Sequence, residues 1–575
     1  MTQAIRKTVP EPLAPAPFNI PQPFQTTLPN GLKIVIFEDK RLPLVSYRLA
    51  FYSGDVNDPE GADGLTSAMA AMLNEGTLNY SSLALAEKIE RLGAGISASS
   101  SADFTVLAAS ALSLYDSEIL ELMSEIIFRP TFPEDELDLY KRNSIENLKF
   151  QRSQPNFLAS EQAARILYGE HPYSKVSPTP ADIEKLSRSA LVDFHRRTLL
   201  PNNAVFIAVG DVTRDSLVKE IEEYFGDWRV GDADVVTFYE PPVRDDVTLT
   251  IVDRPGSAQS NIVLANIALD RTNPDYFAVT VMNQVLGAGA SSRVFMNLRE
   301  EKGYTYGAYT RIDAKRLAGD FEATAEVRTS VTGDSLKEFF YELNRIRDEK
   351  VSEDELADAK NFLTGVFPIR AETQEGLTNL ILSQQIHNLP NDYLQTYRQE
   401  IDRITADDVR RVANKYIIPD SIAIVIVGDA EEILPQARQF AEKIEIFDTE
   451  GKPMDVSEYG RNSSEERAQA TGKWSLVLDF QGQQLPVALT LEQADDVISG
   501  ELETMLGNGK IADGKLNGKK LTATAIAEME GNTVEFVING SIDGDSMTGT
   551  ISAPIIPEPL SFTGMRDEKP KTQSN

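Results

Sequence analysis

Few residues of this 575-residue chain could perform imidazole or thiol chemistry. The chain contains no cysteine, which excludes disulfides, thiolate metal sites and a cysteine nucleophile. Every mechanism that needs an imidazole must use one of three histidines, His171, His195 and His387. They lie in different segments and form no pair with the spacing of metal ligands. We therefore expect all three to be structural.

The segment from Gly64 to Thr77 reads GLTSAMAAMLNEGT. It resembles the signature helix of the pitrilysin/insulinase (inverzincin) metallopeptidases, whose pattern is GLxHxxEHMxxxGT. In that family, two histidines four residues apart on one helical face bind zinc, and the neighbouring glutamate is the general base. Here the histidine positions are Ser67 and Ala71, and the glutamate position is Ala70. None of these side chains can bind Zn²⁺, which prefers imidazole, thiolate or carboxylate ligands.

The resemblance also implies a further zinc ligand, a glutamate about seventy-six residues beyond the histidine pair. That spacing falls near Glu146, Asn147 and Leu148. Glu146 offers a carboxylate, but one ligand without its imidazoles cannot hold zinc at useful affinity. We expect Glu146 to be a solvent-exposed helix residue and the chain to hold no metal or other cofactor.

Further stretches between residues 24 and 445 support this resemblance. They are Leu28-Pro29-Asn30-Gly31, His171-Pro172-Tyr173, Pro201-Asn202-Asn203 before Val209-Gly210-Asp211, and LGAGASSRVFMNLREEKGYTYG at 286–307. The chain most resembles the short-chain branch of the family, in which two separate chains form a clam-shaped dimer. The last hundred or so residues fall outside the resemblance.

The resemblance implies a substrate-binding pair in the second half of the chain. In the family, an arginine and a tyrosine seven residues later lie opposite the zinc site and hydrogen-bond the backbone of the bound peptide. The matching residues are Arg299 and Tyr306. We expect Arg299 in the last helical turn before a Gly303 C-cap and Tyr306 at the start of the next strand. A guanidinium and a phenol there could converge on one carbonyl oxygen and stabilise its developing negative charge.

Ser291, Ser292 and Arg293 also match the family pattern in this segment. The preceding GAGASS lacks the last glycine of a dinucleotide-binding fingerprint. We therefore expect these residues to contribute to helix packing and not to a phosphate site.

An internal repeat organises the elements that must position these residues. The segment LSRSALVDFHRRTLLPNNAVFIAVGD at 186–211 aligns without a gap to ITADDVRRVANKYIIPDSIAIVIVGD at 404–429, an offset of 218 residues. In each copy a Ser or Thr N-cap opens an amphipathic helix, a proline marks a break, and a β-branched strand ends in Val-Gly-Asp. The sequence therefore predicts one structural unit that occurs twice.

The front of each copy reads as two strands followed by an apolar helix. The strands are expected within 28–54 and 247–269, and the helices within 64–74 and 274–286. Strands and helices that mix within each copy predict an α+β fold with largely antiparallel sheets. The resemblance adds that two such units form half of a clam-shaped chamber.

After residue 472 the apolar pattern changes to a period of two. Strands are expected at 474–480, 485–491, 498–504, 521–528 and 533–540, with turns at Gln481-Gly482, Asn508-Gly509, Asn517-Gly518 and Gly531-Asn532. This pattern predicts a small antiparallel meander or barrel. Asp543 and Asp545 are too few carboxylates for a calcium loop and predict a plain turn. The segment 474–560 contains no histidine or cysteine, so common catalytic triads are unavailable there.

These patterns divide the chain into six regions. They are a proline-rich N-terminal arm at 1–23, a first peptidase-like α+β unit at 24–235, a second such unit at 236–448, a linker at 449–472, a small β domain at 473–564 and a polar tail at 565–575.

The net charge of −32 makes attraction to nucleic acid or to an anionic membrane surface unfavourable, because both require basic patches. The negative charge has two possible explanations: it keeps the protein soluble, or it forms an acidic surface that attracts basic peptides. No apolar run is long enough for a membrane span, and the N-terminus does not read as a signal peptide. We expect a soluble protein, cytoplasmic or periplasmic.

The leading hypothesis is a non-catalytic, substrate-binding subunit of a heterodimeric zinc metallopeptidase that degrades or processes peptides. A partner homologue with HxxEH would supply zinc, and this chain would supply Arg299 and Tyr306. The alternative is a purely structural or peptide-binding protein of the same fold with no role in proteolysis, because fold alone does not imply catalysis.

Overall fold

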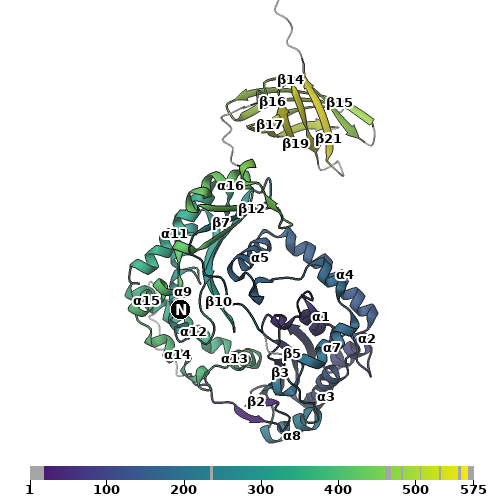
Figure 1. Ribbon diagram of the computed structural model, residues 1–575, viewed down its shortest axis with the longest axis vertical. Helices are drawn as coiled ribbons and strands as arrows, with labels where there is room; N and C mark the ends of the chain where they lie inside the picture. The colour runs from purple at the N-terminus through teal and green to yellow at the C-terminus, as the bar shows by residue number, and fades with distance from the viewer. Residues whose placement is uncertain are drawn as a thin grey trace, which may run out of the picture. The chain divides into compact units, whose positions relative to one another are not determined.

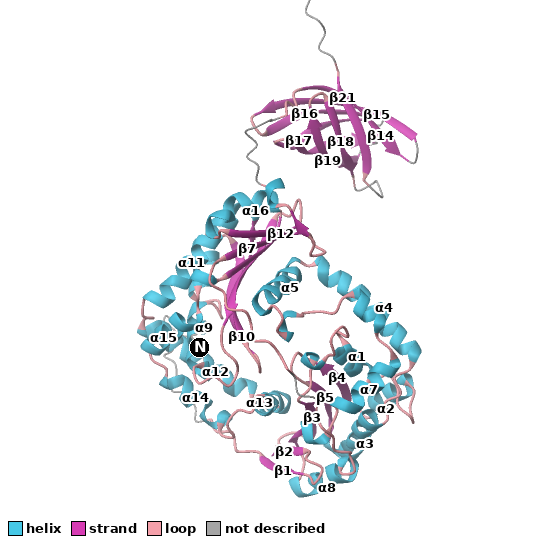
Figure 2. Cartoon of the chain, viewed as in Figure 1, coloured by secondary structure: helices cyan, strands magenta, loops and turns pink. Residues whose placement is uncertain are grey.

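The computed structural model describes residues 18–233, 237–459, 468–480, 483–504, 507–529, 532–553 and 559–567. The chain divides between Tyr459 and Gly460 into two compact units (Figure 1). The first unit contains both copies of the internal repeat, which we call the first half (18–233) and the second half (237–459). Among the residues described in the second unit, the regular elements are all strands (Figure 2).

The first half is a six-stranded sheet covered by helices. The strand order is β1-β2-β6-β3-β5-β4, and only β2 and β6 are parallel neighbours. Its strands are β1 Phe24–Thr27, β2 Lys33–Glu38, β3 Leu44–Phe51, β4 Gly95–Ser100, β5 Thr105–Leu112 and β6 Ala204–Gly210. Its helices are α1 Leu65–Met72, α2 Ser82–Arg91, α3 Asp116–Phe128, α4 Glu134–Ser153, α5 Pro155–Tyr168, α6 Pro180–Lys185, α7 Arg188–Thr198 and α8 Arg214–Phe225.

The second half repeats the order β2-β6-β3-β5-β4 as β7-β11-β8-β10-β9, and β12 and β13 extend its sheet to the order β13-β12-β7-β11-β8-β10-β9. Its strands are β7 Thr248–Asp253, β8 Gln259–Ile267, β9 Thr305–Ala314, β10 Gly319–Arg328, β11 Ala423–Gly428, β12 Lys443–Phe447 and β13 Pro453–Met454. Its helices are α9 Tyr276–Leu286, α10 Arg293–Phe295, the π-helix η5 Met296–Glu301, α11 Thr332–Asp348, α12 Glu353–Arg370, α13 Gln374–Ile386, α14 Tyr393–Arg403, α15 Ala406–Tyr416 and α16 Ala430–Ala437. The predicted α+β class with largely antiparallel sheets is confirmed.

The two aligned segments of the repeat adopt the same structure. Ser187 caps α7 by accepting a hydrogen bond from the Ala190 amide, and Thr405 caps α15 by accepting one from the Asp408 amide. The strands β6 and β11 follow these helices and occupy equivalent central positions in their sheets. The predicted duplication is therefore confirmed.

The two halves exchange one helix each. Helix α5 of the first half packs on β8 and β11 of the second half, where Leu158 and Ala163 contact a cluster that includes Val425. Helix α13 of the second half packs on β3 and β6 of the first half, where Ile381 contacts a cluster that includes Ile207. Helices α5 and α11 lie on opposite sides of the second sheet (Figure 2). In each half, one face of the sheet is therefore covered by a helix from the other half.

Segments at the two ends of the first unit also pack against its other helices and strands. In the predicted N-terminal arm, Ile20 is buried against α13, and residues 1–17 lie outside the described part of the chain. Within the segment predicted to be a linker, Met454 pairs with Ile446 in β12–β13, and the Tyr459 hydroxyl donates a hydrogen bond to Asp253 (2.8 Å). Among the described residues, no helix has the length and apolar composition that crossing a lipid bilayer requires.

The second unit is a closed antiparallel barrel of eight strands joined in chain order. The strands are β14 Gly472–Phe480, β15 Gln483–Ala494, β16 Val497–Thr504, β17 Gly507–Asn517, β18 Lys520–Met529, β19 Asn532–Asp543, β20 Ser546–Ser552 and β21 Leu560–Arg566. Apolar side chains fill its interior, with Trp474 fully buried and Phe562 nearly so. The barrel alternative of the prediction is confirmed.

Three strands of the barrel were not predicted, and one predicted turn was wrong. Asn508-Gly509 lies within β17 and not in a turn. Strand β17 has few large apolar residues, and at Gly514 its neighbour approaches closely: a Cβ there would lie 2.3 Å from the carbonyl oxygen of Ile498. The turns at Gly518 and at Asp543–Asp545 are confirmed, with Gly518 and Gly544 at positive φ.

Candidate functional site

Helix α1 carries the positions that match the zinc ligands of the family. Its first turn is held by Asp58, which accepts hydrogen bonds from the amides of Gly64 (2.7 Å) and Thr66 (2.8 Å) and from the Thr66 hydroxyl (2.6 Å). Leu65 and Met69 are buried on the face that packs into the first core. Burial raises the pKa of Asp58 to about 6. The scaffold of the signature helix is therefore intact.

The ligand positions themselves are filled by small groups. The Ser67 hydroxyl lies 2.9 Å from that of Ser100 at the end of β4, and both hydroxyls donate to Oδ1 of Asp55 (3.2 and 2.9 Å). Ala70 is 1% exposed, whereas Ala71 faces solvent. We call Asp55, Ser67 and Ser100 the serine–aspartate cluster. Sequence reasoning missed it because Asp55 and Ser100 come from segments outside the helix.

Glu146, the expected remnant of the metal site, lies on α4. Its side chain is 71% exposed and pairs with Lys149 one helical turn later (2.6 Å). The prediction of a solvent-exposed helix residue is confirmed. Within the described ranges, no group of three or more histidine, cysteine, aspartate or glutamate residues is arranged to hold a metal ion.

The three histidines lie in packed surroundings. Nε2 of His195 lies 2.8 Å from the carbonyl oxygen of Ile127, and burial lowers its pKa to about 4. Nδ1 of His171 accepts from the Tyr173 amide (3.1 Å), and its ring lies 4.7 Å from the Tyr173 ring. Burial lowers the pKa of His387 to about 4 as well. Burial lowers the pKa of His171 too, so burial disfavours the charged form of all three rings.

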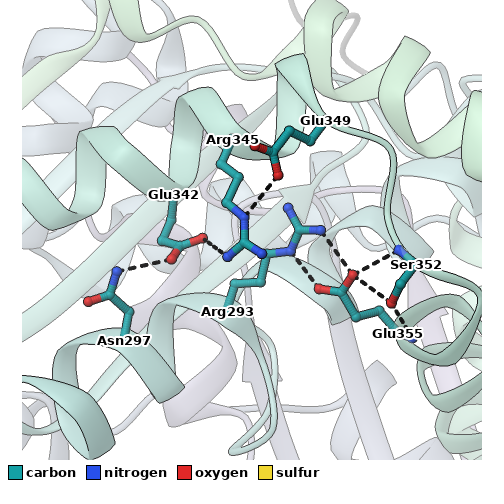
Figure 3. A network of polar contacts seen from close by, with 7 residues as sticks. All are labelled: Arg293, Asn297, Glu342, Arg345, Glu349, Ser352 and Glu355. Carbon is teal, nitrogen blue, oxygen red and sulfur yellow. Dashed lines mark hydrogen bonds and ion pairs between the residues drawn. The ribbon is translucent and has the colours of Figure 1, made fainter.

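In the second half, Arg293 anchors the segment that precedes Arg299 (Figure 3). Its guanidinium is buried and holds both carboxylate oxygens of Glu355, with Nε–Oε1 at 2.7 Å and Nη2–Oε2 at 3.0 Å. Glu355 also accepts from the amide and hydroxyl of Ser352, the N-cap of α12. The hydrogen bond from Arg293 is the main cause that lowers the pKa of Glu355 to about 2. The predicted packing role of Arg293 is confirmed.

A second contact holds the π-helix itself. The side-chain amide of Asn297 donates to Glu342 and Glu338 on α11, both at 3.0 Å. Glu342 is buried and in turn pairs with Arg345 (3.4 Å), as Figure 3 shows. π-Helical turns are rare and are frequent at functional sites. Nothing in the sequence marks this turn, because its residues are compatible with an ordinary α-helix.

Arg299 and Tyr306 contrast with these buried residues. The Arg299 side chain is 46% exposed, lies over the Phe295 ring at 4.8 Å and reaches Glu300 at 3.5 Å. Tyr306 is 92% exposed and is the second residue of β9, the edge strand of its sheet. Gly303 between them has a φ of +62°, as the predicted C-cap requires. The register of β9 on β10 shifts at Tyr306 and Gly307, which marks a β-bulge.

A pocket of about 700 Å³ opens beside the serine–aspartate cluster and is lined by both halves. Its lining includes eight carboxylates and three cationic side chains, so we call it the acidic pocket. The carboxylates are Asp55, Asp58, Glu60, Asp63, Glu170, Asp313, Asp320 and Glu322. Sequence reasoning missed it because its residues come from segments up to about 270 positions apart, which only the pairing of the two halves brings together.

Comparison with known proteins assigns the family. The profile of the insulinase family (peptidase family M16) matches residues 33–176, and that of the peptidase M16 inactive domain matches residues 185–363. The chain therefore belongs to the M16 family. Its α1 positions place it among the members that lack the catalytic residues.

Relatives and solved structures agree with this assignment. The chain is 23% identical over 395 residues to an uncharacterized zinc protease of Streptomyces coelicolor (68% of this chain, 86% of the relative). It is 22% identical over 407 residues to a non-peptidase homolog of Helicobacter pylori (70% and 94%). A crystal structure of a peptidase M16 inactive domain from Pseudomonas fluorescens is similar with a TM-score of 0.67 and 28% identity, covering 71% of this chain and 98% of that one.

Proposed function

We propose that this chain is the non-catalytic, substrate-binding subunit of a heterodimeric zinc metallopeptidase that degrades or processes peptides. A partner of the same family, which carries HxxEH, supplies the zinc ion, the water and the general base. This chain supplies Arg299 and Tyr306 and half of the chamber that encloses the peptide. Neither chain hydrolyses peptides alone.

The proposal rests on a difference in burial between residues of one segment, 286–307, which resembles the family pattern. Arg293 and Asn297 are buried and bonded to α11 and α12, which fixes the backbone around them. Arg299 and Tyr306 extend from this fixed segment and are exposed. An exposed tyrosine and arginine on a rigid support are suited to binding another molecule, since the fold itself does not need them.

The position of Tyr306 on an edge strand supports recognition of peptide backbone. An extended peptide can add to a sheet edge through main-chain hydrogen bonds, which demand little of its sequence. On β9 the amide of Thr310 is already bonded to the carbonyl oxygen of Gly287 (2.9 Å). A peptide would therefore pair near the bulge at Tyr306, beside the Arg299 guanidinium.

The alternative function is a structural or peptide-binding protein of the same fold without a role in proteolysis. The serine–aspartate cluster favours it to this extent: the side chains at the position that matches the zinc site of the family are hydrogen-bonded to one another. The exposure of Arg299 and Tyr306 favours the peptidase-subunit proposal. The two functions differ in whether a zinc-bearing partner needs this chain for turnover.

The test is reconstitution of activity. This chain and an HxxEH homologue from the same genome are purified separately and together, and cleavage of a quenched fluorescent peptide library is measured with and without zinc. We expect a one-to-one complex that cleaves peptides, and no cleavage by either chain alone. Zinc-dependent cleavage by this chain alone would overturn the proposal. Equal cleavage by the homologue with and without this chain would favour the structural alternative.

A further inference from the structure

A pocket of about 290 Å³ lies between the start of α5 and strands β8, β9 and β10. We call it the β9 pocket, because Gly307 and Tyr309 of β9 line it, directly after the exposed Tyr306. Ala159 of α5 and Val263 of β8 are buried and give the pocket an apolar floor. The β9 pocket therefore adjoins a residue that we propose to contact a bound peptide.

Within the described residues, the polar side chains that line the β9 pocket are not hydrogen-bonded to one another. Five of them are uncharged: Asn156, Ser160, Asn261, Tyr309 and Thr324. Asn156 accepts a hydrogen bond from the Phe157 amide (2.9 Å). The other four side chains have no hydrogen-bond partner in the part of the chain that the structure describes. The pocket thus offers several donors and acceptors that the fold does not use.

The same face of the sheet carries paired polar side chains farther along its strands. Glu322 and Thr324 are two residues apart on β10, so their side chains point to the same face. Glu322 pairs with Arg311 of β9 (3.0 Å) in the wall of the acidic pocket. Thr324 in the β9 pocket has no such partner among the described residues. The unused hydrogen-bonding groups are therefore a feature of this pocket and not of the whole face.

Aromatic contacts connect the β9 pocket to Arg299. The Arg299 guanidinium lies over the Phe295 ring (4.8 Å), and that ring packs on the Tyr309 ring (5.5 Å between centroids). Tyr309 in turn lies against Gly307, because a Cβ at Gly307 would be 2.7 Å from its Cε2 atom. A peptide held by Arg299 and Tyr306 would therefore place a neighbouring side chain at the entrance of the pocket.

The lining favours a carboxamide over a charged group. A carboxamide both donates and accepts hydrogen bonds, as do the side-chain amide of Asn261 and the hydroxyls of Ser160 and Thr324. Glu326 is the one charged residue in the described lining, and its carboxylate repels an anion. Because Glu326 is exposed, a pair with a cation there would contribute little.

We propose that the β9 pocket binds the carboxamide side chain of a glutamine or asparagine of the peptide substrate. This proposal rests on the proposed function and names the type of residue that the chamber prefers beside Arg299 and Tyr306. The carboxamide oxygen accepts from the Asn261 amide, and its NH₂ group donates to the hydroxyl oxygens of Ser160 and Thr324.

The volume favours one side chain over a whole small molecule. Sites for small molecules usually measure about 300–1,000 Å³, and the β9 pocket lies at the lower end of this range. Free glutamine offers the same carboxamide as a glutamine in a peptide. The experiment must therefore separate a carboxamide in a peptide from a free one.

The test measures binding of labelled peptides to the full-length chain by fluorescence anisotropy. The probes are short peptides of alanine and glycine that differ only at a central residue, which is glutamine, glutamate, norleucine or lysine. We expect the glutamine peptide to bind about three to ten times more tightly than each of the others, as one net hydrogen bond allows. Its preference over norleucine should persist at high salt, because no charge pair is involved.

Variants identify the pocket as the cause. Ser160→Ala/Thr324→Val removes two hydroxyls with little change of shape, and Asn261→Leu removes the amide. In both variants we expect the preference for glutamine over norleucine to fall to about one. The control Thr550→Val/Ser561→Ala makes the same changes on β20 and β21 of the barrel, at positions of similar exposure, and should keep the native preference.

Each outcome decides the proposal. Equal binding of the four peptides, tighter binding of the lysine peptide, or a native preference in both pocket variants overturns the pocket proposal and leaves the proposed function standing. If free glutamine binds but glutamine gives the peptide no advantage, the site is one for free amides and the proposal is overturned. No binding of any peptide, to the chain alone or to its complex with the partner, overturns both proposals. A glutamine preference that the pocket variants abolish supports the pocket proposal, even where the reconstituted complex cleaves nothing and the proposed function alone fails.

Discussion

Arg293 and Glu355 form a two-pronged ion pair, with Nε–Oε1 at 2.7 Å and Nη2–Oε2 at 3.0 Å (Figure 3). Arg293 lies six residues before Arg299, and Glu355 lies in the first turn of α12. The pair therefore fastens the segment that presents Arg299 to a helix about sixty residues away in the sequence.

Arg293→Ala is expected to lower the free energy of unfolding of the first unit by about 2 kcal/mol. The change removes a buried guanidinium, and the carboxylate that loses its partner is about one third exposed, so the cost is below that of a fully buried pair. Urea denaturation monitored by Trp228 fluorescence in a Trp474→Phe background measures it. Arg299→Ala is the control and should stay within about 0.5 kcal/mol of the native chain, because Arg299 is exposed. Equal losses in both variants would contradict the assignment.

The same pair predicts a dependence of stability on pH. The pKa of Glu355 is lowered from 4.5 to about 2, so the folded state favours the ionised carboxylate. The stabilisation is complete above pH 4.5 and is lost as the pH falls through about 2. It is at most about 3 kcal/mol, since each unit of pKa corresponds to about 1.4 kcal/mol. Unfolding of the native chain and of Glu355→Gln should therefore differ at pH 6 and converge towards pH 2. A constant difference over this range would exclude the mechanism.

The helix exchange predicts that the two halves unfold together and the barrel separately. The chain has two tryptophans, one in each compact unit: Trp228 packs on Phe128 (5.1 Å), and Trp474 is buried in the barrel. Ile381→Ala on α13 should lower the stability of the first unit by about 2–5 kcal/mol, because Ile381 is fully buried against the first sheet.

The tryptophans serve as reporters for this prediction. In a Trp474→Phe background the unfolding midpoint of Trp228 should shift, and in a Trp228→Phe background that of Trp474 should not. A shift of the Trp474 midpoint by Ile381→Ala would show that the two units are energetically coupled. A loss of stability below about 1 kcal/mol would show that α13 is not needed for the first half.

The sequence predicts local structure of the first unit well and its long-range pairings poorly. The N-caps Ser187 and Thr405 are local signals and are found as predicted. The exchange of α5 and α13 is not predictable, because an apolar helix face does not specify which of two similar sheets it covers. The hydrogen bonds of Asp55 with Ser67 and Ser100 also join separate segments of the chain, so the sequence does not predict them either.

Restoring imidazoles to α1 should restore metal binding. Ser67 and Ala71 are four residues apart on one helix, and both are at least partly exposed, so Ser67→His/Ala71→His places two imidazoles on one face. We expect this variant to bind one zinc ion per chain in calorimetry, and the native chain and Ser67→His alone to bind none at the same concentrations. Adding Glu146→Gln tests whether that carboxylate approaches the metal. One tightly bound zinc ion per native chain would contradict the loss of the site.

Arg299 and Tyr306 should matter for turnover and not for folding. If both donate hydrogen bonds to a peptide carbonyl that gains negative charge, Arg299→Ala or Tyr306→Phe should lower kcat of the reconstituted complex by about tenfold to a thousandfold, as loss of an oxyanion donor does. KM should change less, since the interaction strengthens in the transition state. Arg229→Ala and Tyr341→Phe are matched controls at exposed positions outside the segment and should leave kcat unchanged. Unchanged kcat in the Arg299 and Tyr306 variants would reduce the pair to surface residues.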